Sequence, residues 1–78
     1  MLLCDDSRSL REAVSRILAV AGYAVQTASD GWEAWELLQD HPFDLLVTDL
    51  EMPRMDGFDL IARVRRDPEL KDLPIMVL

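Results

Sequence analysis

The amino-acid sequence predicts an α/β domain in which helices cover a doubly wound parallel sheet. Four short apolar runs alternate with three segments whose apolar residues recur at helical spacing. Strands that alternate with helices in this way are joined by right-handed crossovers, which make neighbouring strands parallel. The chain has 78 residues, enough for one small domain. We therefore expect a single βαβαβαβ unit without a linker or an internal repeat.

The first strand and the first helix are expected near the start of the chain. Met1–Cys4 is a continuous apolar run, which is typical of a strand buried on both faces. Ser7 can cap the helix that follows, and Gly22 suits the position at its C-terminal end. The apolar residues of this helix fall on one face, which we expect to point inward: Leu10, Val14, Ile17, Leu18 and Ala21.

The middle of the chain is expected to form a strand, a helix and a further strand. Tyr23–Ala28 has strand character, and Asp30 can cap a helix that continues to about Gln39. Phe43–Thr48 follows Pro42 and is again apolar, so it is expected to be buried in the sheet. The residues of the second helix that we expect to point inward are Ala34, Trp35 and Leu38.

The last part of the chain is expected to form a third helix and a fourth strand. The helix follows a loop that contains Pro53 and Gly57, and it stops at Asp67-Pro68. Its inward residues are expected to be Phe58, Leu60, Ile61 and Val64. Leu73–Leu78 is an apolar strand at an exposed edge, and three helices leave part of one sheet face thinly covered. We interpret both features as signs of a truncated domain.

Composition and charge argue against several classes of partner. The net charge is −7, which disfavours binding of this segment to nucleic acids or to anionic membranes. No apolar run approaches the roughly 20 residues of a membrane-spanning helix. The single cysteine, Cys4, cannot form an internal disulfide and is expected to be a buried residue in a reducing compartment. We therefore expect a cytoplasmic protein.

Three acidic residues follow the ends of predicted strands. Asp5 and Asp6 come directly after the first strand, and Asp49 comes after the third. If these strands are neighbours, the three carboxylates meet at the carboxyl edge of the sheet, where ligands bind in such folds. Their mutual repulsion calls for a cation or a proton, and hard oxygen ligands favour Mg²⁺ or Mn²⁺ over zinc. Alternatively, Asp5 and Asp6 cap the first helix and Asp49 ends its strand in solvent.

The chain resembles the receiver domain of response regulators, the phosphoacceptor module of two-component signalling. The resemblance rests on three segments, Leu2–Ser7, Asp30–Ala34 and Leu46–Gly57. In the last segment an aspartate is followed by Met-Pro and then, eight residues after the aspartate, by glycine. The resemblance covers residues 1–78 and implies a flavodoxin-like (CheY-like) fold with strand order 2-1-3-4. Relative to the family pattern, the fifth strand and the last two helices are missing.

The resemblance also implies a role for each acidic residue. Asp49 would accept a phosphoryl group from a phosphohistidine of a histidine kinase or a histidine phosphotransfer domain. The carboxylates of Asp5, Asp6 and Asp49, with the backbone carbonyl of Glu51, would hold Mg²⁺ (or Mn²⁺), and Asp5 would act mainly through metal-bound water. Such a domain is not itself an enzyme. The lysine that contacts the phosphoryl group in the family has no counterpart, because Lys71, the only lysine, precedes the fourth strand.

Other functions remain open at this point. The segment around Asp49 is also similar to receivers fused to chemotaxis-type hybrid histidine kinases, in which case the parent protein would be an enzyme. A truncated chain could instead be a binding module that is never phosphorylated. An aspartate-dependent phosphatase fits less well, because Glu51 stands where those enzymes carry a second aspartate.

Overall fold

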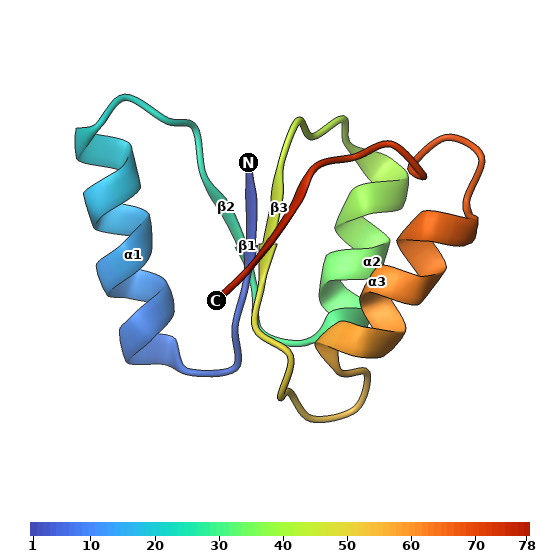
Figure 1. Ribbon diagram of the computed structural model, residues 1–78. Coiled ribbons are helices and arrows are strands. Elements are labelled where there is room, and N and C mark those ends of the chain that lie inside the picture. The colour runs from blue at the N-terminus through green and yellow to red at the C-terminus, as the bar shows by residue number, and fades with distance from the viewer.

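The computed structural model describes all residues 1–78 and contains four strands and three helices (Figure 1). In chain order the elements are β1 (Leu2–Cys4), α1 (Arg8–Val20), β2 (Gln26–Ala28), α2 (Gly31–Asp40), β3 (Leu46–Thr48), α3 (Gly57–Arg66) and β4 (Ile75–Val77). The strands form one parallel sheet in the order β2-β1-β3-β4. The predicted fold class, element order and strand order are therefore confirmed.

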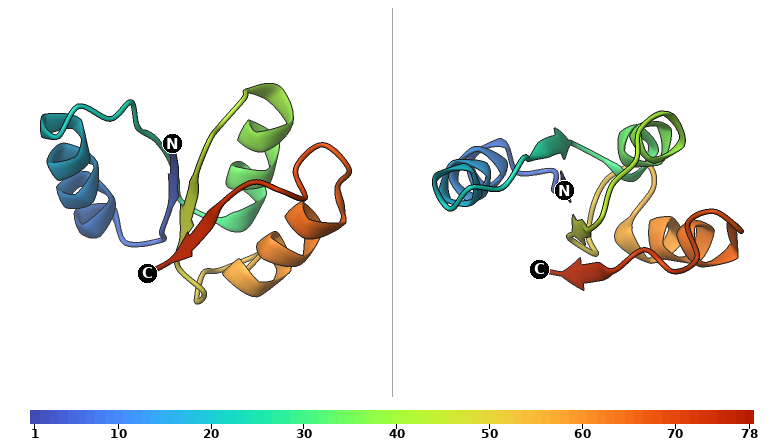
Figure 2. Two further views of the ribbon diagram at one scale, coloured as in Figure 1. Left: turned by 45° about the horizontal axis from the view of Figure 1, so that its top comes forward. Right: turned by 90° about the horizontal axis from the view of Figure 1, so that it is seen from above.

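The helices form two unequal layers, one on each face of the sheet. Helix α1 lies alone on one face, and α2 and α3 lie side by side on the other (Figures 1 and 2). This arrangement follows from the direction of the connections. The chain moves one way along the sheet from β1 to β2 and the opposite way from β2 to β3, so right-handed crossovers place α1 and α2 on opposite faces.

The hydrophobic core lies mainly between the sheet and the pair α2 and α3. It contains eleven buried residues: Leu2, Cys4, Ala28, Ala34, Leu38, Leu46, Met52, Met55, Leu60, Val64 and Leu73. None of these residues comes from α1, and no residue of α1 is fully buried. Ile17 of α1, for example, is 68% exposed. The prediction that one face of the sheet is thinly covered is correct, and the inward face expected for the first helix is only partly buried.

The strands of the sheet are shorter than the sequence predicts. The central strand β1 offers three residues, Leu2–Cys4, and each neighbour pairs with three residues of its own. Hence β2 starts at Gln26 rather than at Tyr23, and β3 starts at Leu46 rather than at Phe43. No helix of the chain combines the length and the apolar character needed to cross a membrane.

The inward position predicted for Phe58 is wrong. Helix α3 begins at Gly57, where the Asp56 carboxylate caps it by accepting a hydrogen bond from the Asp59 amide at 2.9 Å. Phe58 lies in the first turn, two residues before the buried Leu60, which turns it about 200° around the helix axis. Its side chain is 65% exposed and faces the acidic edge of the sheet.

Candidate functional site

The carboxyl ends of β1 and β3 bring three carboxylates together. Asp5 and Asp6 follow β1 and Asp49 follows β3, and the two strands pair so that Cys4 is opposite Thr48. The amide of Asp49 continues this pairing by donating to the carbonyl oxygen of Cys4 at 3.0 Å. One carboxylate oxygen from each aspartate lies within 4.8 Å of the other two. The carboxylates thus meet where the sequence places them.

Asp5 is the buried member of the cluster, with 1% of its surface exposed. Its Oδ1 accepts a hydrogen bond from the Ser7 amide at 2.8 Å, and its Oδ2 is buried without any hydrogen-bond partner. The cap of α1 is Ser7, whose hydroxyl accepts from the Leu10 amide at 3.3 Å. Helix capping therefore leaves half of the Asp5 carboxylate unexplained, and a buried carboxylate oxygen without a partner is costly.

Asp49 is half-buried and presents its two oxygens differently. Its Oδ1 accepts hydrogen bonds from the amides of Leu50 at 2.7 Å and of Glu51 at 3.5 Å. Its Oδ2 accepts no hydrogen bond from the chain. Asp49 lies in an open cleft of about 630 Å³, lined by Asp6, Asp49, Leu50, Glu51, Met52, Pro53, Asp56 and Phe58. One carboxylate oxygen is thus held in place, and the other is available for chemistry.

The loop between β3 and α3 forms one wall of this cleft, and we call residues 50–56 the acceptor loop. Its ends are joined by a hydrogen bond from the Gly57 amide to the Leu50 carbonyl at 3.0 Å. A side chain at Gly57 would collide with the carbonyl oxygen of Asp49, so this close approach requires glycine. Met52 and Met55 anchor the acceptor loop in the core, while Pro53 and Arg54 are exposed.

The donor set fits a hard divalent cation. Every candidate ligand is a carboxylate or backbone oxygen, which Mg²⁺ and Mn²⁺ prefer. The partnerless Oδ2 of Asp5 is an independent sign, because a cation beside it would compensate its burial. Glu51, two residues after Asp49 in the chain, lines the same cleft. His41 is exposed just beyond the C-terminus of α2 and belongs to no cluster of potential ligands.

Cys4 directly precedes Asp5 and is fully buried, but it is not part of the cluster of potential ligands. Its sulfur is 3.3 Å from the carbonyl oxygen of Asp30 and 3.2 Å from the sulfur of Met52. Burial is the main reason that the pKa of the Cys4 thiol rises from 9.0 to about 12, and nearby carboxylates add to the rise. A hydrogen bond with Thr48 partly opposes it. The thiol therefore stays protonated at neutral pH.

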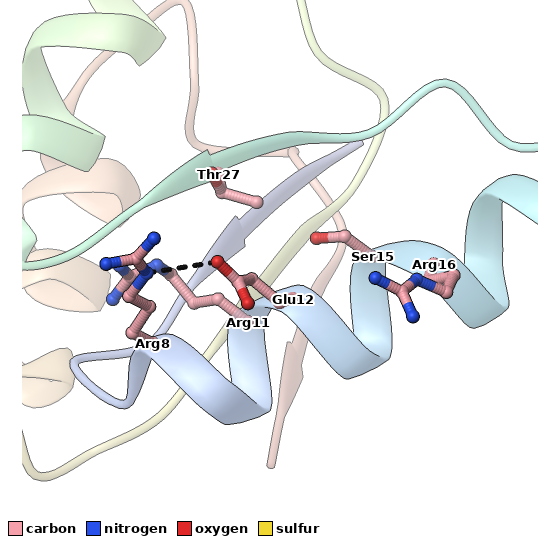
Figure 3. A pocket seen from close by; sticks show the side chains of 6 residues that line it. All are labelled: Arg8, Arg11, Glu12, Ser15, Arg16 and Thr27. Atoms are coloured by element: carbon pink, nitrogen blue, oxygen red, sulfur yellow. Dashed lines mark hydrogen bonds and ion pairs between the residues drawn. The ribbon is translucent and has the colours of Figure 1, made fainter.

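A second pocket, between α1 and β2, has a different chemistry (Figure 3). It measures about 480 Å³ and is lined only by polar residues: Arg8, Arg11, Glu12, Ser15, Arg16 and Thr27. Arg8 and Glu12 form an exposed ion pair at 3.0 Å. Arg11 donates to the carbonyl oxygen of Asp5 at 2.8 Å, which ties the first turns of α1 to the acidic cluster.

Sequence reasoning missed two residues that line the cleft, Asp56 and Phe58. A local signal for Asp56 was present, because an aspartate directly before Gly57 and three residues before Asp59 is a typical helix N-cap. With the helix start placed there, the helical periodicity turns Phe58 away from the core.

Comparison with known proteins assigns the chain to a family. The family model of the response regulator receiver domain matches residues 1–78, the whole of the chain. The chain belongs to the response regulator receiver family. It is therefore a signalling domain of two-component systems, and domains of this kind are not classical enzymes.

Relatives of the receiver domain include both sequences and solved structures. Response regulator MprA of Mycobacterium sp. (strain KMS) is 41% identical over 78 residues, which are 100% of this chain and 33% of that protein. Chemotaxis response regulator CheY4 of Vibrio cholerae is 43% identical with a TM-score of 0.93, and the match covers 97% of this chain and 63% of that chain. Response regulator TrrA of Thermotoga maritima, solved in complex with Mg²⁺-BeF, is 30% identical with a TM-score of 0.85 over 97% and 63% of the two chains. The receiver domain spans a tenth to a third of the length of the curated relatives it matches.

Proposed function

We propose that residues 1–78 act as a phosphoacceptor in two-component signalling and that Asp49 carries the phosphoryl group. The main support is the convergence of Asp5, Asp6 and Asp49 within 4.8 Å at the carboxyl edge of the sheet. Among the three, Asp49 is the one that two backbone amides hold at one oxygen, while its other oxygen accepts no hydrogen bond from the chain and the residue lines the open cleft. Membership of the receiver family agrees with this assignment.

The transfer that we propose is an in-line displacement at phosphorus. The Oδ2 of Asp49 attacks the phosphorus of a phosphohistidine, an O–P bond forms, and the N–P bond breaks. The electron pair of the broken bond returns to the imidazole nitrogen. The chain contributes mainly alignment, because the amides of Leu50 and Glu51 fix Oδ1 and so orient Oδ2.

We propose Mg²⁺ (or Mn²⁺) as the cation of this site, held by the carboxylates of Asp5, Asp6 and Asp49 and by the backbone carbonyl of Glu51. When bound, the cation neutralises charge on the carboxylates and on the phosphoryl oxygens. The buried, partnerless Oδ2 of Asp5 supports this assignment. The Mg²⁺-BeF complex of TrrA, a structural relative, agrees with it.

The proposed phosphodonor is a histidine kinase or a histidine phosphotransfer domain. Such a partner must bring its phosphohistidine into the cleft and therefore must contact the rim around it. Phe58 on one side of the cleft is exposed, and Leu10 at the start of α1 is exposed as well. The hydrogen bond from Arg11 to the Asp5 carbonyl places α1 against the cluster, so α1 is the helix that we propose for docking.

A phosphorylation assay with a small donor tests the assignment of Asp49. Incubation with Mg²⁺ and phosphoramidate, whose N–P bond resembles that of phosphohistidine, should add the mass of one phosphoryl group. Asp49→Asn should abolish the gain, because an amide oxygen is a much weaker nucleophile than a carboxylate. Asp44→Asn is the matched control, since Asp44 is exposed and distant from the cleft. A mass gain that survives in Asp49→Asn, or its absence from the wild type, would contradict the proposal.

A further inference from the structure

We propose that Asp30 and Arg54 are positioning residues whose ion pair clamps the acceptor loop against α2 and thereby sets the Mg²⁺ affinity and the phosphorylation rate of Asp49. The part that concerns phosphorylation rests on the proposed function. Neither residue lines the acidic cleft, so both would act through the acceptor loop rather than on the ligands.

The Asp30 carboxylate connects two elements through its two oxygens. Oδ1 caps α2 by accepting a hydrogen bond from the Glu33 amide at 2.9 Å. Oδ2 binds Nη1 of Arg54 at 3.0 Å, although the two residues are 24 positions apart in the chain. The side chain of Asp30 is 10% exposed and that of Arg54 is 67% exposed. Because one partner is largely shielded from water, salt screens this pair less than a fully exposed one.

Backbone and core contacts also hold the acceptor loop against the start of α2. The Gly31 amide donates to the carbonyl oxygen of Met55 at 3.0 Å, and a side chain at Gly31 would collide with that oxygen. On the core side, the Cys4 sulfur is 3.2 Å from the sulfur of Met52 and 3.3 Å from the Asp30 carbonyl. The acceptor loop, the end of β1 and the start of α2 therefore meet at one junction, and the ion pair closes it on the solvent side.

The backbone of Arg54 gives a second reason to assign a role to its side chain. Its φ is +68°, and Arg54 is the only residue other than glycine with a positive φ. Glycine or asparagine adopts this left-handed conformation at lower cost than arginine. The ion pair with Asp30 is the interaction that an arginine gains at this position and that glycine or asparagine would lack.

The clamp is coupled to Asp49 by the chain itself. Leu50 and Glu51, whose amides hold Oδ1 of Asp49, are part of the acceptor loop. If the ion pair is lost, the buried methionines and the backbone hydrogen bonds still hold the loop, but its exposed part is released, so Asp49 and the Glu51 backbone are oriented less firmly. The effect on the site is then a loss of preorganisation for both the cation and the phosphodonor.

The sign of the effect separates a clamp from simple electrostatics. Removing the positive charge of Arg54 should strengthen Mg²⁺ binding if only distant charge matters, and removing the negative charge of Asp30 should weaken it. A clamp predicts that both changes weaken binding, because either one breaks the same ion pair.

Two asparagine substitutions and their combination test the proposal. Asp30→Asn keeps a good helix cap, and Arg54→Asn keeps a residue that tolerates the left-handed backbone. We expect each to weaken Mg²⁺ binding, measured by calorimetry, about three- to fivefold, the size of one partly exposed ion pair. Phosphorylation by phosphoramidate should slow by a similar factor. The double variant should be no worse than either single variant, since the pair can be lost only once.

The controls distinguish positioning from general stability. Lys71→Gln removes one positive charge from an exposed side chain in the loop before β4, at the opposite edge of the sheet from the acidic cluster, and should leave both readouts unchanged. Arg54→Gly removes the ion pair while relieving the backbone, so it should fold at least as well as the wild type and still bind Mg²⁺ less tightly. Arg54→Lys should recover part of the affinity.

Several outcomes would overturn the clamp. Opposite effects of Asp30→Asn and Arg54→Asn on Mg²⁺ affinity would assign the effect to charge alone. Lower unfolding free energy with unchanged Mg²⁺ affinity and unchanged phosphorylation rate would reduce the pair to a structural contact. If the wild type binds Mg²⁺ but is not phosphorylated, the proposed function fails, and the Mg²⁺ measurements still decide on the clamp.

Discussion

The two faces of the sheet differ in how firmly they are packed. Helices α2 and α3 cover one face together and share the eleven-residue core with it, whereas α1 covers the other face alone and contributes no fully buried residue. The acceptor loop is attached to the well-packed face through Met52, Met55 and the start of α2. The loop that follows Asp49 is therefore attached to the firmly packed face of the sheet. Helix α1, which follows Asp5 and Asp6, is packed less firmly.

Matched leucine substitutions should show this difference most strongly. Leu60 of α3 is fully buried and Leu10 of α1 is 43% exposed. Leu60→Ala should lower the free energy of unfolding by about 2–5 kcal/mol, because it removes buried methyl groups and leaves a cavity. Leu10→Ala should cost less than about 1.5 kcal/mol, since much of that side chain is already in water. Denaturant unfolding measures both values, and equal losses would show that the two faces are packed alike.

Two glycine substitutions compare the end of the acceptor loop with the end of α1, and both should lower the free energy of unfolding. Gly57→Ala forces a side chain against the Asp49 carbonyl and should cost about 1–3 kcal/mol of unfolding free energy. Gly22→Ala meets open space, but its φ of +98° makes alanine unfavourable by about 1–2 kcal/mol.

Mg²⁺ titration should then distinguish these two variants. Gly57→Ala is expected to weaken Mg²⁺ binding, because it displaces the backbone beside Asp49, and Gly22→Ala is expected to leave it unchanged. An effect of Gly22→Ala on Mg²⁺ binding would mean that α1 is coupled to the site more tightly than its packing indicates.

The smallest expected effect concerns Cys4 and pH. The folded chain raises the pKa of this thiol to about 12 from 9.0, so the folded state holds the proton more tightly than the unfolded state does. Above about pH 9 the unfolded chain releases the proton first, and the unfolding free energy should fall as pH rises toward 12.

Comparison with Cys4→Ala isolates this contribution from the other groups that titrate at high pH. The unfolding free energy of the wild type should fall faster than that of Cys4→Ala between pH 9 and 12, in denaturant titrations at each pH. If the two unfolding free energies fell in parallel with pH, folding would not raise the pKa of the Cys4 thiol.

The fold could be predicted from the sequence because its main determinants are local. The apolar run Leu2–Cys4 marks a buried strand, and Ser7 and Asp30 mark helix starts. The alternation of strands with helices along the chain predicts a parallel sheet. The acidic site could be located for the same reason. Asp5, Asp6 and Asp49 each stand directly after a strand, so the strand order alone brings them to one edge.

The features that sequence reasoning missed depend on contacts between distant residues or on exact helix starts. Nothing in the local sequence pairs Asp30 with Arg54 or gives Arg54 a left-handed backbone, because both follow from how the acceptor loop packs against α2. Phe58 is apolar, which favours a position in the core, but it lies in the first turn of α3 about 200° around the axis from the buried Leu60. The extent of strand pairing is likewise set by the short central strand and not by the length of each apolar run.

The pairing of Cys4 with Thr48 has a consequence for how the site comes into being during folding. Asp5 and Asp49 lie in opposite halves of the chain, and only the register between β1 and β3 brings them together. In a parallel sheet, a slip of one residue would turn the side chain of Asp49 toward the opposite face of the sheet. A chain in which β1 and β3 are not yet paired therefore lacks the acidic cluster, and a cation that bound all three carboxylates would stabilise the native topology by mass action.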